Sequence, residues 1–304
     1  MPAADRQLRL LSRIPPRSSI LGTISFDELR LTATHGSGTL PGKPGQLPRE
    51  IVVMDDVVDD PRMADRLAAL AYAGVRVRRA RDHYERSQRR VLLEALDESW
   101  FLFDRPLRAH RVYAAVKRVG DIVLGLLGSL LLLLLVPLLW LAVRLDDGGP
   151  LFYRQERVGR GGETFQIWKF RTMRADAEAA GPRWARSQDD RVTRVGRVLR
   201  RTRIDEIPQF VNVLRGEMSL VGPRPERPHF VETLSRAIPY YERRHLMRPG
   251  ITGWATVRFG YGDSVTDKWH SHEYDLYYLK HRSLRLDLEI VVRTIVVMLM
   301  RRGQ

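Results

Sequence analysis

The chain contains no cysteine among its 304 residues. This absence excludes disulfide bonds, thiolate metal sites and cysteine nucleophiles, and it fits a reducing compartment or chemistry based on oxygen nucleophiles. A secretory signal pattern is also missing at the N-terminus, because residues 1–13 carry charges and only a short apolar cluster.

Acidic residues are in deficit. The chain has 36 aspartates and glutamates against 51 lysines and arginines, which gives a formal net charge of +15. Such a surplus needs a negative partner, and the classes that qualify are nucleic acid, anionic lipid headgroups and a phosphate-rich substrate. With 44% hydrophobic and 29% charged residues, the composition excludes a disordered chain and allows a sizeable buried core.

A long apolar run distinguishes among these partners. Residues 122–143 include six consecutive leucines and no formal charge. A helix of this length extends about 33 Å, which is enough to cross a bilayer core. The leucines leave it no polar face, so the run favours a membrane segment over the core helix of a soluble protein. A nucleic-acid-binding protein would leave this run unexplained, and we therefore expect lipid and no nucleic acid as partners.

The membrane segment is predicted to be bent. Pro137 lies inside the run, where it removes a backbone donor and crowds the preceding turn. Basic residues flank both ends, so the positive-inside rule gives only a weak orientation. A re-entrant helix at 117–148 that enters and leaves on the cytoplasmic face satisfies both flanks, and we favour it over a straight span.

The part before the membrane segment divides into two regions. Residues 1–49 carry many turn formers and are predicted to be rich in loops. Residues 50–104 are predicted to form a small parallel α/β unit. Its expected elements are strands at 50–54, 75–77 and 99–103 and helices at 61–73 and 89–96. It has no glycine-rich phosphate loop, so a regulatory or scaffolding role is favoured over nucleotide binding.

Residues 149–304 follow the membrane segment without a long linker and are predicted to form the catalytic domain. A strand is expected at 165–168. Helices are expected near 191–201, 205–215, 227–245 and 284–300. The last of these is apolar enough to lie against a membrane or a core, and the sequence leaves both open.

Two adjacent carboxylates, Asp205 and Glu206, mark the strongest chemical segment. Arginines precede them, and Pro208 must fall in the first turn of a helix. The helix dipole and the arginines then favour ionised carboxylates. One such carboxylate can attack phosphorus and the other can hold Mg²⁺, whereas an isolated pair would more often serve as a helix cap with surface salt bridges.

Two further segments carry cations suited to phosphate. Two prolines fix the backbone around Arg224, which pre-organises its guanidinium for phosphate, although a rigid turn explains the pattern equally well. The alternating basic residues that include Lys169 and Arg171 could bind a diphosphate or form a solvated strand face. The spacing of His270, His272 and Glu273 could suggest a metal site. A single His-x-His pair is a weak signal when no third ligand is placed, so we prefer a structural role for these residues.

Three long strings carry a resemblance to a known family. They are RQERVGRGGETFQIWKFRTM at 154–173, DDRVTRVGRVLRRTRIDEIPQFVNVLRGEMSLVGPRPE at 189–226 and RPGITGWATV at 248–257. From about Lys117 to its C-terminus the chain resembles the bacterial sugar transferases, the monotopic polyprenol-phosphate phosphoglycosyl transferases of exopolysaccharide biosynthesis. Residues 50–104 also resemble the later half of the Rossmann-like domain of larger members, whose four preceding transmembrane helices this sequence lacks.

The resemblance implies roles for individual residues. Asp205 matches the nucleophile and Glu206 the Mg²⁺ ligand, while Arg200 and Arg224 match phosphate-binding arginines. The motif at the start of the re-entrant helix matches Lys117, Arg118 and Asp121, and the helix-breaking proline matches Pro137. The chain departs from the family pattern at Val136 and Arg203, where serine is common.

The implied fold class is α/β, with a partial Rossmann-like unit, a re-entrant membrane helix and a compact, mostly helical α+β monotopic catalytic domain. The implied reaction transfers a sugar 1-phosphate from a nucleotide-diphosphate sugar, expected to be a UDP-hexose, to polyprenol (undecaprenyl) phosphate through an aspartyl sugar-phosphate. The implied location is the cytoplasmic face of the bacterial inner membrane, and a homodimer is left open. The alternative is a catalytically inactive membrane scaffold of a polysaccharide-assembly complex.

Overall fold

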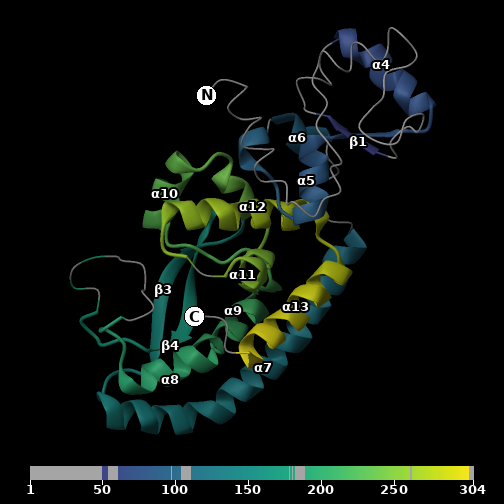
Figure 1. Ribbon diagram of the computed structural model, residues 1–304. Coiled ribbons are helices and arrows are strands. Elements are labelled where there is room, and N and C mark those ends of the chain that lie inside the picture. Colours follow the sequence, from purple (N-terminus) through teal and green to yellow (C-terminus); the bar gives the residue numbers. More distant parts are fainter. Residues whose placement is uncertain are drawn as a thin grey trace. The chain divides into compact units, whose positions relative to one another are not determined.

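The computed structural model describes residues 50–53, 61–96, 98–103, 111–177, 179, 181, 189–260 and 262–300. The predicted loop-rich segment 1–49 lies outside these residues. The chain divides into two compact units, residues 1–97 and 98–304, and each is described by itself (Figure 1).

The first unit contains a parallel strand pair with a helical crossover. Strand β1 (Glu50–Val53) pairs in parallel with β2 (Arg76–Arg79), and α4 (Pro61–Tyr72) connects them. Met63 and Leu67 of α4 pack with Val53 in a small core. The predicted order of strand, helix and strand is therefore confirmed, while a Rossmann-like domain stays a prediction because the described residues form a two-stranded sheet.

Two elements predicted for this region are wrong. The helix lies earlier than 89–96, because α5 (Ala80–Gln88) ends where Arg89 adopts a left-handed conformation, and only the 3₁₀ turn η1 (Leu93–Ala95) follows. The segment predicted as a strand at 99–103 is the helix α6 (Glu98–Phe103), which belongs to the second unit. A short apolar run does not distinguish a strand from a buried helix, and here the run buries Trp100.

The second unit is built on one long helix, α7 (Arg111–Asp146), which contains Pro137 and follows a bowed path in Figure 1. One face is buried along its length, at Asp121, Gly125, Gly128, Leu132, Leu139 and Val143. A Cβ atom at Gly128 would lie 2.2 Å from the ring of Phe210, so only glycine allows this close approach of the helices. The apolar helix is thus an integral part of the second unit.

The remaining elements complete the second unit. The hairpin consists of β3 (Phe152–Val158), the turn η2 (Arg160–Gly162) and β4 (Thr164–Phe170). The helices and 3₁₀ turns that follow are α8 (Arg194–Thr202), η3 (Ile204–Glu206), α9 (Gln209–Arg215), α10 (Pro228–Ala237), η4 (Tyr241–Leu246), α11 (Trp254–Arg258), α12 (Val265–His281) and α13 (Leu284–Leu299). Strands β5 (Ser219–Val221) and β6 (Gly250–Thr252) pair in parallel.

Sequence signals explain several of these boundaries. Thr193 accepts a hydrogen bond from the Gly196 N–H and so caps α8. Ser264 and Asp267 form a reciprocal capping box at the start of α12. One core cluster joins Leu132, Leu139 and Val143 of α7 to Leu151, Phe170 and Leu199. Each fully buried leucine contributes about 1.5–3 kcal/mol, so this cluster fixes α7 to the hairpin and to α8.

The predicted strand at 165–168 is confirmed within β4, and helices occur near the four predicted positions. The helix predicted at 227–245 is interrupted, because α10 ends at Ala237 and Pro239 precedes the turn η4. Helix α13 has a face packed in the core, which includes the buried Ile290, and an exposed apolar face, which includes Leu288 at 64% exposure.

A continuous set of exposed apolar side chains covers the outer face of α7. Leu133 and Leu134 are each 69% exposed, and Leu138 is 64% exposed. By its length and composition, helix α7 could cross a membrane. Exposed apolar area of this extent marks an interaction surface.

Candidate active site

The adjacent carboxylates lie in a tight turn between two helices. Helix α8 ends at Arg203, which adopts a left-handed conformation with φ of 60° and donates its N–H to the Arg200 carbonyl. The turn η3 then carries Asp205 and Glu206, and Pro208 immediately precedes α9. Both carboxylates are buried, with 8% and 7% exposure. Their position just before a helix start is as predicted.

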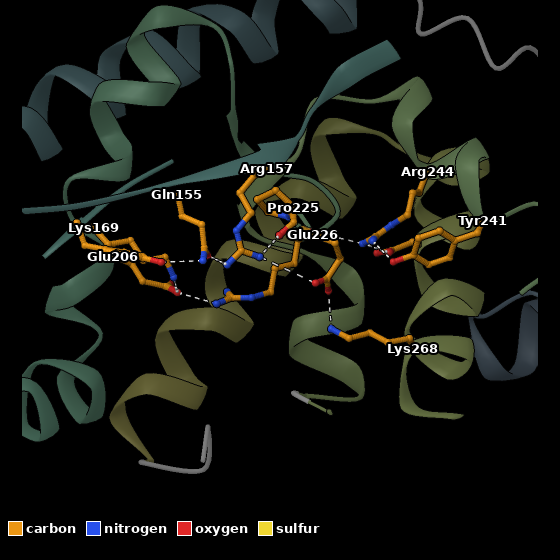
Figure 2. A network of polar contacts seen from close by, with 12 residues as sticks. Gln155, Arg157, Lys169, Glu206, Pro225, Glu226, Tyr241, Arg244 and Lys268 are labelled. Carbon is orange, nitrogen blue, oxygen red and sulfur yellow. Dashed lines mark hydrogen bonds and ion pairs between the residues drawn. The ribbon is translucent and has the colours of Figure 1, made fainter. Parts of the chain in front are cut away.

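Glu206 is bound by two cations from other elements. Lys169 Nζ of β4 lies 3.2 Å from Glu206 Oε1, and an Arg224 guanidinium nitrogen donates to the same oxygen at 3.0 Å (Figure 2). Burial alone would raise the pKa of Glu206, but these two cations outweigh it and hold the pKa well below its usual range. Glu206 is therefore ionised at neutral pH.

Asp205 lies in a contrasting environment. Its Oδ1 atom is buried without a hydrogen-bond partner among the described residues. Burial, followed by the charge of Glu206, raises the pKa of the Asp205 carboxyl to about 6. The pKa values of the two neighbouring carboxyls thus differ widely: that of Glu206 is lowered and that of Asp205 is raised. Such a difference is typical of paired groups with separate chemical roles.

The position of Lys169 depends on a buried amide. Asn212 of α9 accepts a hydrogen bond from the Trp168 N–H at 3.0 Å and donates to the Gln166 carbonyl at 2.8 Å. These bonds fix the register of β4 against α9, so Lys169 extends toward Glu206. Burial lowers the pKa of Lys169, although Glu206 acts in the opposite direction.

The carboxylate pair fits a Mg²⁺ ion. Magnesium in phosphate-transfer sites is held by one or two carboxylates together with substrate phosphates rather than by an all-protein cage. The ionised Glu206 offers such a ligand, and it lies beside the unpartnered oxygen of Asp205. Within the described residues, no group of three or more His, Asp or Glu side chains forms a metal site.

The structure places the other predicted phosphate ligands in different ways. Arg224 and Lys169 meet at Glu206, as described. Arg171 lies on the same segment as Lys169 but is bound to the Asp147 carboxylate and, at 2.6 Å, to the Pro150 carbonyl. It therefore holds the end of α7, and a phosphate-binding role for it is disfavoured. Arg200 lies on α8, and the cations with the largest effects on the two carboxyls are Lys169, Arg203 and Arg224.

The motif at the start of the membrane segment attaches α7 to the second unit. Lys117 Nζ lies 3.1 Å from Asp287 Oδ2 of α13. Arg118 donates to the carbonyl oxygens of Val213 and Leu214 at the end of α9. These two basic residues thus bind protein groups.

Asp121 completes this attachment. Its Oδ1 atom accepts from the Ser219 hydroxyl at 3.0 Å and from the Leu220 N–H at 2.9 Å. The residues of the motif therefore reach three separate elements, α13, α9 and β5. The two histidines of the weak metal signal are also engaged, since His270 Nδ1 lies 3.2 Å from Glu273 and His272 Nε2 lies 3.2 Å from the Tyr240 carbonyl.

A buried network beyond Arg224 was not predicted. Arg244 donates to the Arg224 carbonyl at 2.9 Å and to Asp275 Oδ2 at 2.8 Å (Figure 2). Glu226 pairs with Lys268 and, at 4.0 Å, with Arg157. Arg157 and Glu226 lie within the strings quoted from the sequence, and Glu226 follows Pro225. The other members are brought together by the fold from distant positions.

The arrangement suits transfer at phosphorus. A buried carboxylate lies beside cations that can neutralise a diphosphate, and charge neutralisation is the main requirement of such transfers. The active-site cations come from β4 and from the loop after β5, so the fold must be complete before they converge.

Comparison with known proteins agrees with this chemistry. The chain is 46% identical over 184 residues to the UDP-N-acetylgalactosamine-undecaprenyl-phosphate N-acetylgalactosaminephosphotransferase of Aeromonas hydrophila, which covers 60% of this chain and 44% of that protein. It is 42% identical over 199 residues to the UDP-glucose:undecaprenyl-phosphate glucose-1-phosphate transferase of Escherichia coli K12, covering 64% of this chain and 42% of that protein.

A third relative differs in coverage. The exopolysaccharide production protein PSS of Rhizobium leguminosarum bv. phaseoli is 36% identical over 190 residues, which is 60% of this chain and 94% of that protein. The chain thus spans less than half of the first two relatives and nearly all of the third. The bacterial sugar transferase family matches residues 112–301, which include α7 and both active-site carboxylates. The chain belongs to the bacterial sugar transferase family.

Proposed function

We propose that the protein transfers a sugar 1-phosphate from a UDP-hexose to undecaprenyl phosphate. The observation that carries this proposal is the buried Asp205–Glu206 pair. Lys169 and Arg224 neutralise Glu206, whereas Asp205 keeps a raised pKa. The names of the Aeromonas and Escherichia relatives supply the two substrate classes.

In the first step a carboxylate oxygen of Asp205 attacks the β-phosphorus of the donor. The bond from this phosphorus to the bridging oxygen breaks, and uridine monophosphate leaves with the electron pair. The sugar phosphate is then held on Asp205 as an acyl phosphate. Arg224 and Lys169 orient the diphosphate and offset its charge.

In the second step a phosphate oxygen of the lipid attacks the same phosphorus. The bond to Asp205 breaks, the carboxylate is regenerated and a diphosphate-linked lipid sugar is released. Glu206 would hold Mg²⁺, which would supply charge neutralisation at the substrate phosphates when bound. Arg200 is proposed to bind a substrate phosphate from its position on α8.

The packing of α7 supports a re-entrant, one-sided membrane attachment. Its buried face runs from Asp121 to Val143, which corresponds to about 33 Å of helix. A straight crossing would draw the polar elements packed on this face into the hydrocarbon, where unpaired polar groups are costly. The exposed leucines of α7 and α13 instead suit insertion into the cytoplasmic face of the inner membrane, where a soluble donor and a lipid acceptor meet.

An active enzyme is favoured over an inactive scaffold because both carboxylates and their cations are assembled. The Rhizobium relative's name supports a role in exopolysaccharide production. A homodimer stays a prediction.

Release of nucleoside monophosphate tests the proposal. The purified protein is incubated with Mg²⁺ and a panel of nucleotide sugars, with and without undecaprenyl phosphate. We expect continuous release with the lipid and at most one equivalent without it, and Asp205→Asn as the matched control should release none. A wild-type protein that releases none from any donor would refute the activity.

A further inference from the structure

A polar pocket adjoins the active site on the far side of Arg224. The pocket is largely open to solvent: its enclosed volume is about 30 Å³, and the empty space that includes the open part is about 410 Å³. Its walls come from separate elements and include Arg224 and Glu226 from the loop after β5, Arg244 from η4, Thr256 from α11, and Lys268 and Ser271 from α12. The mechanism above assigns no role to this pocket.

Arg224 connects the pocket to the reacting carboxylates. Its guanidinium group bonds Glu206 at 3.0 Å, and the same residue lines the pocket. A substrate whose phosphate is bound by Arg224 therefore has the pocket available for the group attached to that phosphate.

The residues that line the pocket supply both hydrogen-bond donors and acceptors. Glu226 and Asp275 supply carboxylates, and Lys268 and Arg244 supply cations paired with them. The Nε atom of Arg244 is buried without a partner among the described residues. Each sugar hydroxyl both donates and accepts, so carboxylate–cation pairs of this kind suit a ring with adjacent hydroxyls.

Two hydroxyls in the wall also favour a sugar. Thr256 and Ser271 are among the lining residues, and within the part of the chain that the structure describes neither hydroxyl makes a hydrogen bond. A flat base would need an exposed aromatic face for stacking. The aromatic residue among the described lining residues is Tyr241, which is only 2% exposed and accepts a hydrogen bond from Arg244.

We propose that this pocket binds the hexose of the donor and that Thr256 and Ser271 contribute to sugar selectivity. This inference rests on the proposed function, because it takes the donor to be a nucleotide sugar. The hexose is favoured over the ribose of the nucleotide because the hexose is attached to the phosphorus that Asp205 attacks, whereas the ribose lies one phosphate further away.

A purely structural role of the surrounding network must be distinguished from sugar binding. Arg244 bonds the Arg224 carbonyl, so changes to Arg244, Asp275 or Glu226 would also displace Arg224. Removing a single free hydroxyl avoids this difficulty. Thr256→Val and Ser271→Ala keep side-chain volume close to the original, and Thr233→Val on the exposed face of α10 is the matched control.

The experiment measures binding and turnover separately. Dissociation constants of UDP-glucose, UDP-galactose, their N-acetylhexosamine counterparts and 2′-deoxyuridine diphosphate glucose are determined by calorimetry with full-length protein in nanodiscs. Release of nucleoside monophosphate is followed for the same donors. We expect each pocket variant to change the ratio of affinities between two hexoses by about fivefold, the effect of one hydrogen bond, while Thr233→Val leaves it unchanged.

Two results would overturn the inference. Equal weakening of all donors would assign the hydroxyls a structural role, and a changed preference between ribose and deoxyribose donors alone would place the nucleotide there. Different results would refute the proposed function. A wild-type protein that binds hexoses selectively through Thr256 or Ser271 but releases no monophosphate would support the pocket and refute the transferase reaction. A protein that binds no nucleotide sugar would refute both.

Discussion

Arg224, in the loop after β5, donates a hydrogen bond to Glu206 Oε1 across 3.0 Å. Lys169 lies 3.2 Å from the same oxygen. This shared oxygen explains why neighbouring carboxyls behave differently: Glu206 keeps its charge, and that charge raises the pKa of buried Asp205. In the proposed reaction Asp205 is the nucleophile, while the ionised Glu206 would hold Mg²⁺.

Replacing Asp205 with asparagine should remove activity and stabilise the fold. The raised pKa of Asp205, about 6, means that folding favours its protonated form, so this contribution to stability is lost as the pH rises through 6. Neutral asparagine avoids that loss at pH 7. Turnover should fall by orders of magnitude, and the melting temperature should rise by about 2 °C or more.

Calorimetry at pH 7 and again at pH 4 checks the sign of this effect. The stabilisation should shrink at the lower pH, where Asp205 is protonated in the folded protein. A lower melting temperature for Asp205→Asn at pH 7 would contradict the electrostatic account.

The rate should depend on pH through the carboxyl pair. Because the attacking form of Asp205 is ionised, kcat/KM for the donor should fall as the pH drops through about 6 and level off above it. Glu206→Gln removes the neighbouring charge, so kcat/KM should fall at a lower pH than in the wild type. The maximal rate should also be reduced. A flat profile between pH 5 and 7 would argue against Asp205 as nucleophile.

Both ends of α7 should face the same side of the membrane. The absence of cysteine allows single cysteines at the exposed Arg111 and Arg144. Gly149 is unsuitable because a Cβ there would lie 2.5 Å from the Arg171 guanidinium. In oriented vesicles an impermeant thiol reagent should label both positions from the same side as a reporter cysteine at the exposed Glu232. Labelling of Arg111→Cys and Arg144→Cys from opposite sides would establish a crossing.

The first unit should be dispensable for chemistry. The family match begins at residue 112, and the match to the Rhizobium relative covers 94% of that protein. Deletion of residues 1–97 should therefore leave a folded, membrane-bound protein whose turnover per molecule is close to that of the full chain. Loss of turnover in a deletion variant that still melts cooperatively would count against this division of roles.

Local signals in the sequence predicted the elements near the carboxylates. Pro208 located the start of α9, and the charge-free run containing Pro137 identified α7. The strand predicted at 99–103 is wrong because a short apolar run has no period that separates a strand from a helix. Helix α12 was not predicted because aromatic and charged residues are mixed along it, which gives no clear apolar stripe at helical spacing. Seven of its residues are nevertheless buried.

The site itself was only partly predictable. Asp205 and Glu206 are adjacent in sequence, so their proximity needed no fold. The contact between Lys169 and Glu206 depends on Asn212 fixing β4 against α9, and the bond from Arg244 to Arg224 joins residues 20 positions apart. For Arg171 the sequence was misleading. Its position two residues after Lys169 predicted a phosphate ligand, whereas its guanidinium binds the Asp147 carboxylate. Contacts between distant residues are set by packing, which a single sequence does not display.

The central claim is that Asp205 carries the sugar phosphate during the reaction. Intact mass spectrometry, after brief incubation with nucleotide sugar and Mg²⁺ but without lipid, tests it most directly. The account predicts an added mass equal to one sugar phosphate in the wild type, lost when undecaprenyl phosphate is added and absent in Asp205→Asn. Normal turnover without any such adduct, or an equal adduct on the asparagine variant, would contradict it.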